Sequence, residues 1–167
     1  MDAAKKWLRE KGLAAAGKRA GRGTGAGVVE SYVHATGTIG AMVEVGCETD
    51  FVARNDTFKA FARDVALQIA AGRSLQFVSE DEIPEEAKEA ELRVFEQQAA
   101  DKPENVRPKI AEGKLRKWME EVVLLNQEHV NPDKHDSKTI EQLRAELSAK
   151  TGENVVIRRF ARFQVGQ

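Results

Sequence analysis

The sequence predicts an α+β domain in which an antiparallel sheet, built from a hairpin and a C-terminal strand, packs against several helices. Residues 28–34 and 39–45 are rich in β-forming side chains, whereas apolar side chains recur at a period near 3.6 in several segments between residues 55 and 152. Residues 154–165 are again rich in branched and aromatic residues. This order of elements favours an α+β fold whose last strand returns to pair with the hairpin.

The length and composition fit one compact, charge-rich domain with at most a small appendage. The chain has 167 residues, of which 41% are hydrophobic, 32% charged and 6% aromatic. No apolar stretch reaches the length of a membrane span, and the first residues lack the apolar core of a secretory signal. The single cysteine, Cys47, cannot form an internal disulfide. These features predict a cytosolic protein.

The charge balance favours protein partners over nucleic acid. The chain carries 26 basic and 27 acidic residues, and its net charge is −1. Residues 1–22 are an exception, because they contain seven bases and only two acids. An RNA-binding or ribosome-associated role of this basic N-terminal arm is therefore the alternative hypothesis.

The N-terminal part predicts a short helix followed by a linker. Residues 1–20 read as a helix around Trp7, weakened by Gly12 and Gly17. Four glycines between residues 21 and 27 are typical of a linker, so we place a domain boundary there. The domain proper is then expected to occupy residues 28–167.

The next segments predict a hairpin covered on one face. A four-residue loop separates the two β-forming runs. In the second run, apolar residues share one face, while smaller or more polar residues share the other; the apolar ones are Ile39, Ala41, Val43 and Val45.

The helical patterns predict four segments. The first begins at the N-cap Asn55 and stops at Gly72, and the second begins near Pro84 and runs to about residue 100. After Pro103, a strong apolar stripe over residues 115–123 predicts a helix that is central to the core. The last helix is expected to be capped by Ser137 and to end at Gly152.

None of the potentially reactive residues forms a convincing catalytic or metal-binding pattern. The glycine cluster follows a helix and lacks the Lys and Ser/Thr of a phosphate-binding loop. Cys47 could act with His34 and Asp50, but a buried, inert cysteine is favoured. His129 and His135 are expected to lie on a surface loop. Arg158, Arg159 and Arg162 could bind phosphates, but ordinary alternating arginines of a strand with one solvent-exposed face are favoured.

The segment from Glu48 to Asn55 differs from the rest because it places an aromatic residue in a short, polar connection. The Phe51 side chain must either pack beneath this connection or be exposed for contact with a partner. The residue types alone leave both alternatives open.

Residues 43–55, Val-Glu-Val-Gly-Cys-Glu-Thr-Asp-Phe-Val-Ala-Arg-Asn, resemble the signature of the elongation factor Ts family. Similarity extends through residues 110–115 and 121–125, and through Gly-Glu-Asn-Val at 152–155 to Phe163. Upstream, residues 7–12 resemble the last helix of the family's ubiquitin-associated-like module. The resemblance thus covers almost the whole chain.

This resemblance implies a guanine nucleotide exchange factor that binds elongation factor Tu with GDP and is not an enzyme. It implies that Asp50 and Phe51 enter the region of the GTPase's phosphates and magnesium, and that four neighbours hold this tip in shape: Thr49, Val52, Arg54 and Asn55. No cofactor or metal of the chain's own is expected.

The resemblance also implies domain roles, an oligomeric state and a cellular location. Residues 1–20 would be a remnant of the ubiquitin-associated-like module, and residues 28–167 a core and dimerisation domain. The single core module resembles the short form of the family, which implies a homodimer built on the sheet edge and apolar helix faces. The expected location is the bacterial cytoplasm, with an organelle stroma or matrix as the alternative.

Overall fold

The computed structural model describes residues 2–167, and the side chains of all of these except residues 2–6, 8, 9, 12 and 13. The chain divides into two compact units. Unit 1 comprises Met1–Arg73 and Glu128–Gln167, and unit 2 comprises Ser74–Gln127. The predicted core domain thus contains an inserted helical unit that the sequence patterns did not reveal. No helix within residues 2–167 has both the length and the apolar character needed to cross a membrane.

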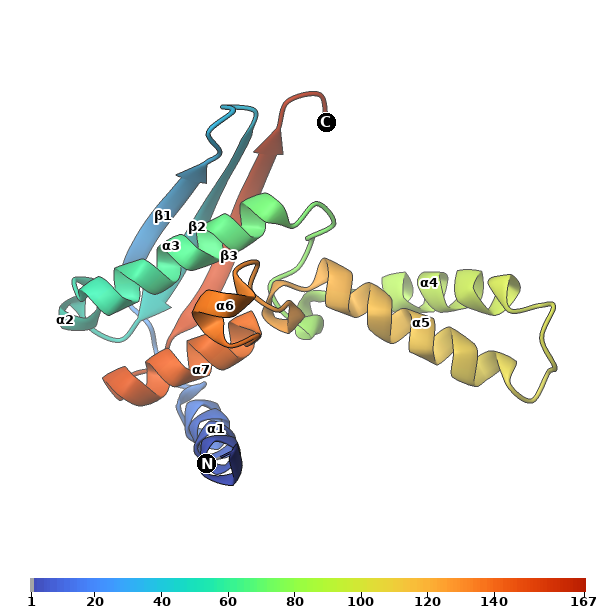
Figure 1. Ribbon diagram of the computed structural model, residues 1–167, viewed down its shortest axis with the longest axis horizontal. Helices are drawn as coiled ribbons and strands as arrows, with labels where there is room; N and C mark the ends of the chain where they lie inside the picture. The colour runs from blue at the N-terminus through green and yellow to red at the C-terminus, as the bar shows by residue number, and fades with distance from the viewer. Residues whose placement is uncertain (1) are drawn as a thin grey trace. The chain divides into compact units, whose positions relative to one another are not determined.

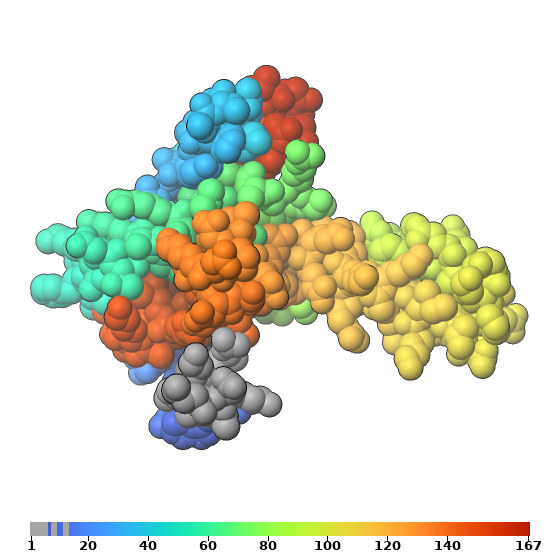
Figure 2. Space-filling model, viewed as in Figure 1, coloured from blue at the N-terminus to red at the C-terminus, as the bar shows by residue number. Residues whose placement is uncertain are grey.

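Unit 1 contains a three-stranded antiparallel sheet, which confirms the predicted α+β class. The strands are β1 (Ala26–Val33), β2 (Ile39–Cys47) and β3 (Val156–Gln164), in the order β1-β2-β3. The C-terminal strand pairs with the hairpin as predicted. Figure 2 shows the hairpin turn and the end of β3 side by side, where the backbone N–H of Val165 donates to the carbonyl of Thr38.

Strand β1 begins two residues before the predicted start, so Gly27 lies inside the strand, opposite Gly46. A Cβ atom at position 27 would lie 2.3 Å from the carbonyl oxygen of Val45. Glycine is required here because the two backbones approach too closely for any side chain.

The linker before β1 is tied down at two points. The carbonyl of Arg22 accepts a hydrogen bond from Asn154, and Thr24 accepts from the guanidinium of Arg158. Strand β3 and the residues before it therefore hold this glycine-rich segment in place.

Helix α3 (Asp56–Ala71) covers the inner face of the sheet and lies in front of it in Figure 1. Its apolar residues recur at helical spacing and form the core with the inward side chains of β2. The buried set includes Phe58, Phe61, Ala62, Val65 and Ile69. Both predicted ends are confirmed, because Asn55 caps the N-terminus and Gly72 follows the last helical residue.

The opposite face of the sheet is open in unit 1. Outward side chains of all three strands remain exposed there, although several are large and apolar: Val29, Val33, Met42 and Phe163. Within unit 1 the sheet is thus covered on one side only, as the pattern of β2 predicts.

Helix α7 (Ile140–Thr151) begins at Thr139 and not at the predicted Ser137. Thr139 and Gln142 form a reciprocal capping box, whereas Ser137 lies in a left-handed turn with a φ of 52°. Gly152 ends the helix at a φ of 74°, as predicted. Ahead of α7, Pro132–His135 form the short helix α6.

Helix α1 (Asp2–Arg19) runs without a break through both of its glycines and packs against α7. Ala16 is buried, whereas Trp7 is 57% exposed with the Lys11 ammonium 4.7 Å from its ring centroid. The predicted N-terminal helix is therefore confirmed, and its C-terminal half contributes to the core of unit 1.

Unit 2 is built on two packed helices, α4 (Glu85–Gln98) and α5 (Arg107–Val122). It also contains the short helices η1 (Glu80–Glu82) and η2 (Leu124–Asn126). Its small core contains Ile83, Val122 and Val123. The prediction that the stripe of residues 115–123 lies at the centre of the main core is wrong. Trp118 and Met119 are only partly buried and pack within unit 2.

Candidate partner-binding site

The tip segment, defined as Glu48–Asn55, joins β2 to α3 and contains a one-turn helix, α2 (Asp50–Ala53). Thr49 is the N-cap, and its hydroxyl accepts a hydrogen bond from the backbone N–H of Val52 at 3.5 Å. The backbone N–H of Arg54 donates to the carbonyl of Asp50 at 3.0 Å. The short, polar connection identified in the sequence therefore contains one closed turn of helix, at the margin of unit 1 (Figure 1).

Phe51 projects from this turn and is 87% exposed, more than any other large apolar side chain that the structure describes. Its neighbours point the other way, since Ala53 is buried and Val52 is partly buried. Of the two alternatives for Phe51, the structure thus shows the exposed one. An exposed phenylalanine on an ordered turn is a typical anchor for a protein partner.

Asp50 also faces solvent, where its carboxylate lies 3.4 Å from the guanidinium of Arg54. Both side chains are at least 74% exposed, so this ion pair contributes little to stability. A partner could therefore replace the Asp50–Arg54 contact at a small cost in free energy.

Asn55 connects the tip segment to the core. Its side-chain oxygen accepts a hydrogen bond of 2.8 Å from the backbone N–H of Thr57, which caps α3 as predicted. Because α3 carries buried residues along its length, this cap joins the tip to a helix that packs in the core of unit 1.

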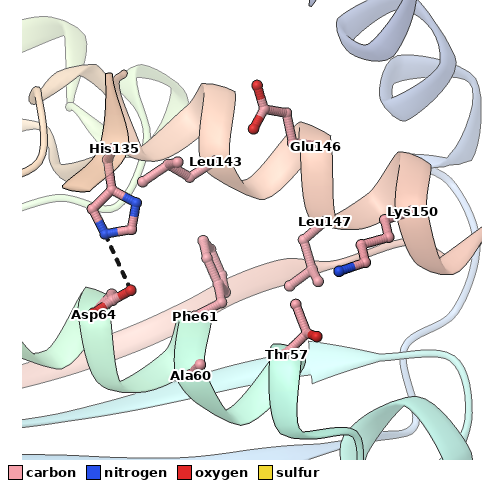
Figure 3. Close-up of a pocket in the computed structure, with 9 residues that line it drawn as sticks. All are labelled: Thr57, Ala60, Phe61, Asp64, His135, Leu143, Glu146, Leu147 and Lys150. Carbon is pink, nitrogen blue, oxygen red and sulfur yellow. Dashed lines mark ion pairs between the residues drawn. The ribbon is translucent and has the colours of Figure 1, made fainter. Parts of the chain in front are cut away.

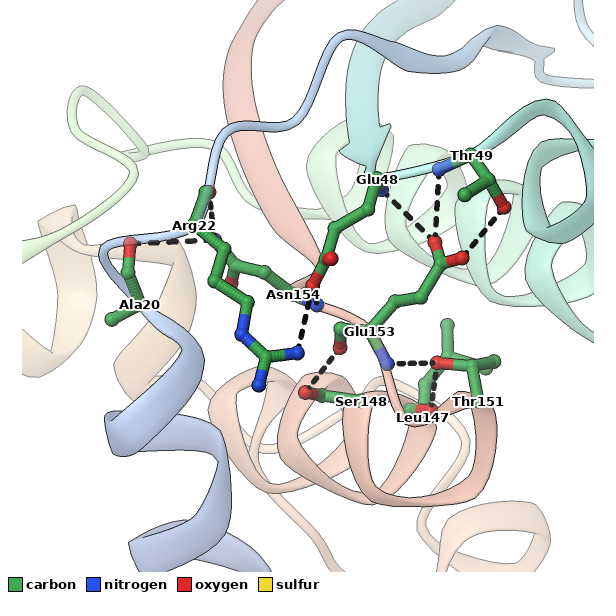
Figure 4. A network of polar contacts seen from close by, with 9 residues as sticks. All are labelled: Ala20, Arg22, Glu48, Thr49, Leu147, Ser148, Thr151, Glu153 and Asn154. Carbon is green, nitrogen blue, oxygen red and sulfur yellow. Dashed lines mark hydrogen bonds and ion pairs between the residues drawn. The ribbon is translucent and has the colours of Figure 1, made fainter.

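The acceptor that holds the base of the tip is Glu153, which the sequence analysis did not single out as a site residue. Its Oε2 accepts hydrogen bonds from the backbone N–H groups of Glu48 and Thr49 at 3.0 and 3.1 Å, and its Oε1 accepts from the Thr49 hydroxyl at 2.6 Å (Figure 4). The only signal in the sequence was the Gly-Glu-Asn-Val segment that resembles the family.

The next residue, Asn154, links the same region to the end of α1. Its backbone N–H donates to the carboxylate of Glu48 at 2.6 Å, and its buried side chain donates to the carbonyls of Ala20 and Arg22 at 3.3 and 2.9 Å (Figure 4). The Arg22 guanidinium lies 3.5 Å from the Glu48 carboxylate. Three distant segments of the chain therefore meet at one turn.

Cys47 is buried, as the sequence analysis favoured. Its thiol donates to the carbonyl of Thr49, and burial, with the nearby charge of Glu153, raises the pKa of the thiol above its ordinary value. His34 lies beyond the opposite end of the hairpin, roughly 25 Å away along an eight-residue strand. The structure therefore does not bring the hypothetical pair of Cys47 and His34 together.

The prediction that His129 and His135 lie on a surface loop is wrong for His129, which is 2% exposed. The two rings meet edge to face with centroids 4.2 Å apart, and Nε2 of His135 lies 3.2 Å from the carboxylate of Asp64 in α3 (Figure 3). Tertiary packing thus gathers three residues that offer ligand atoms within 4.8 Å of one another: Asp64, His129 and His135.

Hydrogen bonding nevertheless argues against a metal at this cluster. Nδ1 of His129 accepts from the backbone N–H of Asn131 at 3.0 Å, so Nε2 carries the ring proton and donates to the carbonyl of Asp64 at 3.2 Å. A metal on Nε2 would displace that proton, and Asn131 would have to break its hydrogen bond before Nδ1 could take it. We therefore interpret the cluster as structural.

The cluster borders a pocket of about 280 Å³ whose apolar lining includes Phe61 and Leu143 (Figure 3).

The arginines of β3 bind other groups of unit 1. Arg159 pairs with Glu44 at 2.8 Å, Arg158 binds Thr24 and lies 3.4 Å from the Glu44 carboxylate, and Arg162 donates to the carbonyl of Ala70 at 3.1 Å. Arg158 and Arg159 are exposed, as expected for a strand with one solvent-exposed face. Arg162 is half-buried instead, because it lies opposite the buried Ala41 and contacts α3.

Comparison with known proteins agrees with the similarity seen in residues 43–55. A family model described as elongation factor TS matches residues 17–136. Over its full length the chain is 51% identical to elongation factor Ts of Thermosynechococcus vestitus, of which it spans 56%. It is 46% identical to that of Trichodesmium erythraeum and 49% identical to that of Desulfitobacterium hafniense, and spans 76% of each.

Proposed function

The chain belongs to the elongation factor Ts family of translation elongation factors, and on this basis we propose that it binds elongation factor Tu and promotes release of GDP. The observation that carries the proposal is the exposed Phe51 on an ordered turn. The proposed cellular location is the bacterial cytoplasm, where translation elongation takes place in the bacterial relatives.

The proposed mechanism is thermodynamic linkage. A protein that binds the GTPase better when the nucleotide site is open must weaken GDP binding by the same factor by which GDP weakens its own binding. Phe51 is the wedge that fills an apolar slot of the partner, and Asp50 disturbs the polar contacts near the magnesium ion. The surrounding residues hold these two in place: Thr49 and Asn55 as caps, Val52 as a partly buried support, and Arg54 as the partner of Asp50.

In this role the chain is an exchange factor and not an enzyme, because no covalent bond is formed or broken. The burial of Cys47 and the raised pKa of its thiol weigh against catalysis by this cysteine. The chain needs no cofactor of its own for such a role, since binding free energy alone drives the release of GDP.

We also propose the domain roles and the assembly. Residues 1–20 would belong to a ubiquitin-associated-like module, residues 21–27 would link it, and residues 28–167 would form the core that binds a second copy. The open face of the sheet is the best candidate for that contact, because Val33 and Phe163 are at least 67% exposed there. Paired sheets would bury these side chains about a symmetry axis.

The decisive test is release of a fluorescent GDP analogue from elongation factor Tu, with the wild-type chain and with Phe51→Ala. The wild type should accelerate release, and the variant should lose about 2 kcal/mol, or roughly 30-fold, if Phe51 is a hot spot. Val94→Ala, which trims an exposed side chain on α4, is the control and should behave like the wild type.

A folded wild-type chain that leaves the release rate unchanged would contradict the proposed function. The basic N-terminal arm would then become the leading candidate. In that case RNA binding should weaken steeply with salt and should depend on the bases of residues 1–22.

A further inference from the structure

We infer that Glu153 is a positioning residue for the tip segment: its carboxylate fixes the turn that presents Phe51, without itself touching the partner. This inference rests on the proposed function of the tip, but its geometric part concerns the free protein. It begins from the three hydrogen bonds that this carboxylate accepts from Glu48 and Thr49.

The three donors to the Glu153 carboxylate are well suited to hold the tip segment in place. Two backbone N–H groups and one hydroxyl all donate to the same carboxylate, and hydrogen bonds to a charged acceptor are roughly twice as strong as neutral ones. The Thr49 hydroxyl that donates to Glu153 is also the oxygen that caps α2. Glu153 therefore orients the cap, and the cap orients the turn that carries Phe51.

Glu153 is itself held on a rigid support. It follows Gly152, whose left-handed conformation ends α7, and its carbonyl accepts a hydrogen bond of 2.6 Å from the Ser148 hydroxyl. Ser148 and Asn154, which flank this turn in the structure, are both buried. The carboxylate thus transmits the position of a packed helix to a solvent-exposed tip (Figure 4).

The physical consequence is preorganisation. A tip that is already ordered loses less conformational freedom when it binds, so more of the contact free energy is available to displace GDP. Without the carboxylate, the N–H groups of Glu48 and Thr49 would bond to water, and Phe51 would occupy a wider range of positions. The free protein should show this loss of order, and the exchange assay should show its effect.

The test compares Glu153→Gln with the wild type in the full chain. Glutamine keeps the size of the side chain but replaces one acceptor oxygen with a donor, so at least one of the three hydrogen bonds is lost. Glu146→Gln is the matched control, because Glu146 lies on α7 and pairs with Lys138 instead of the tip. Thermal unfolding of each variant verifies that it is folded.

Two measurements are needed. Amide hydrogen exchange of Glu48 and Thr49 in the free protein should be about tenfold faster in Glu153→Gln and unchanged in Glu146→Gln. The rate of GDP release at a saturating concentration of the chain should also fall about tenfold in Glu153→Gln.

The outcomes separate this inference from the proposed function. Unchanged amide exchange in Glu153→Gln would overturn the inference, and so would faster amide exchange with an unchanged rate of GDP release. Slower release without faster amide exchange would also overturn it, because Glu153 would then act by direct contact with the GTPase. If the wild type does not accelerate release, the proposed function fails, and the role of Glu153 in exchange fails with it; amide exchange then still decides whether Glu153 orders the tip.

Discussion

The hydroxyl of Thr49 lies 2.6 Å from Oε1 of Glu153, although 104 positions separate the two residues in the sequence. One supplies the cap of the turn that carries Phe51, and the other follows the last helix of the chain. The shape of the proposed exchange tip is therefore set jointly by the first and last parts of unit 1.

Asn55→Ala should lower the free energy of unfolding by about 1 kcal/mol, because the backbone N–H of Thr57 loses its acceptor at the start of α3. Asn55→Asp should retain most of the stability, since a carboxylate caps equally well. Urea unfolding of the three proteins measures the difference. Equal stability of the alanine variant would show that the cap seen in the structure has no energetic weight.

Gly27→Ala should destabilise the hairpin by about 1–3 kcal/mol, because the new methyl group would meet the backbone of β2 at Val45. Gly25→Ala is the matched control: a Cβ atom there meets no atom within 4 Å. Thermal unfolding should separate the two variants clearly. If both unfold at the same temperature, the close approach of the two strands is not maintained in solution.

The stability of the fold should fall as the pH drops below about 6.5, because of His129. Burial lowers the pKa of His129, and the hydrogen bond to the Asp64 carbonyl opposes this effect; the charges of His135 and Lys134 lower the pKa further, whereas that of Asp64 raises it. Since the folded-state pKa lies below the unfolded one, the unfolded chain binds more protons over this range. Protonation of Nδ1 would also remove the acceptor of the hydrogen bond from the backbone N–H of Asn131, so that two donors would face each other.

Urea unfolding at several pH values between about 7.5 and 5.5 tests this dependence, above the range where most carboxylates titrate. His129→Gln should flatten the decline, whereas His34→Gln, which changes an exposed histidine at the end of the hairpin, should not. If the stability of His129→Gln declines with falling pH as steeply as that of the wild type, another group is responsible for the decline.

Met42→Glu should dissociate the proposed homodimer, because it places a charge in the middle of the open face of the sheet, between Ser31 and Ala161. Val94→Glu adds the same charge to an exposed position on α4 and should leave the assembly intact. Sedimentation equilibrium of the three proteins measures the molar mass. A wild-type monomer, or a dimer that survives Met42→Glu, would rule out this face as the interface.

Local patterns were sufficient for the existence of the long helices and the strands of unit 1, although not for its short helices or for every end. Helix α3 begins after Asn55 and ends before Gly72, as predicted, and the alternation in β2 correctly identified its buried face. Both predictions succeeded because caps and periodicity depend on neighbours in the chain. Ser137 was the wrong cap for α7, since the competing box of Thr139 and Gln142 satisfies two backbone groups instead of one. The role of the stripe at 115–123 was also misjudged, because an amphipathic pattern does not specify which partner covers it.

By itself the sequence determined the α+β class, most helix and strand positions, the family and the unusual segment around Phe51. Only the tertiary structure decided that Phe51 is exposed, that Glu153 holds the tip, and that Asp64 meets the two histidines. The physical reason is the range of the interactions. Capping and periodicity act within a few residues, whereas burial and hydrogen bonds between residues 104 positions apart exist only after the chain has folded.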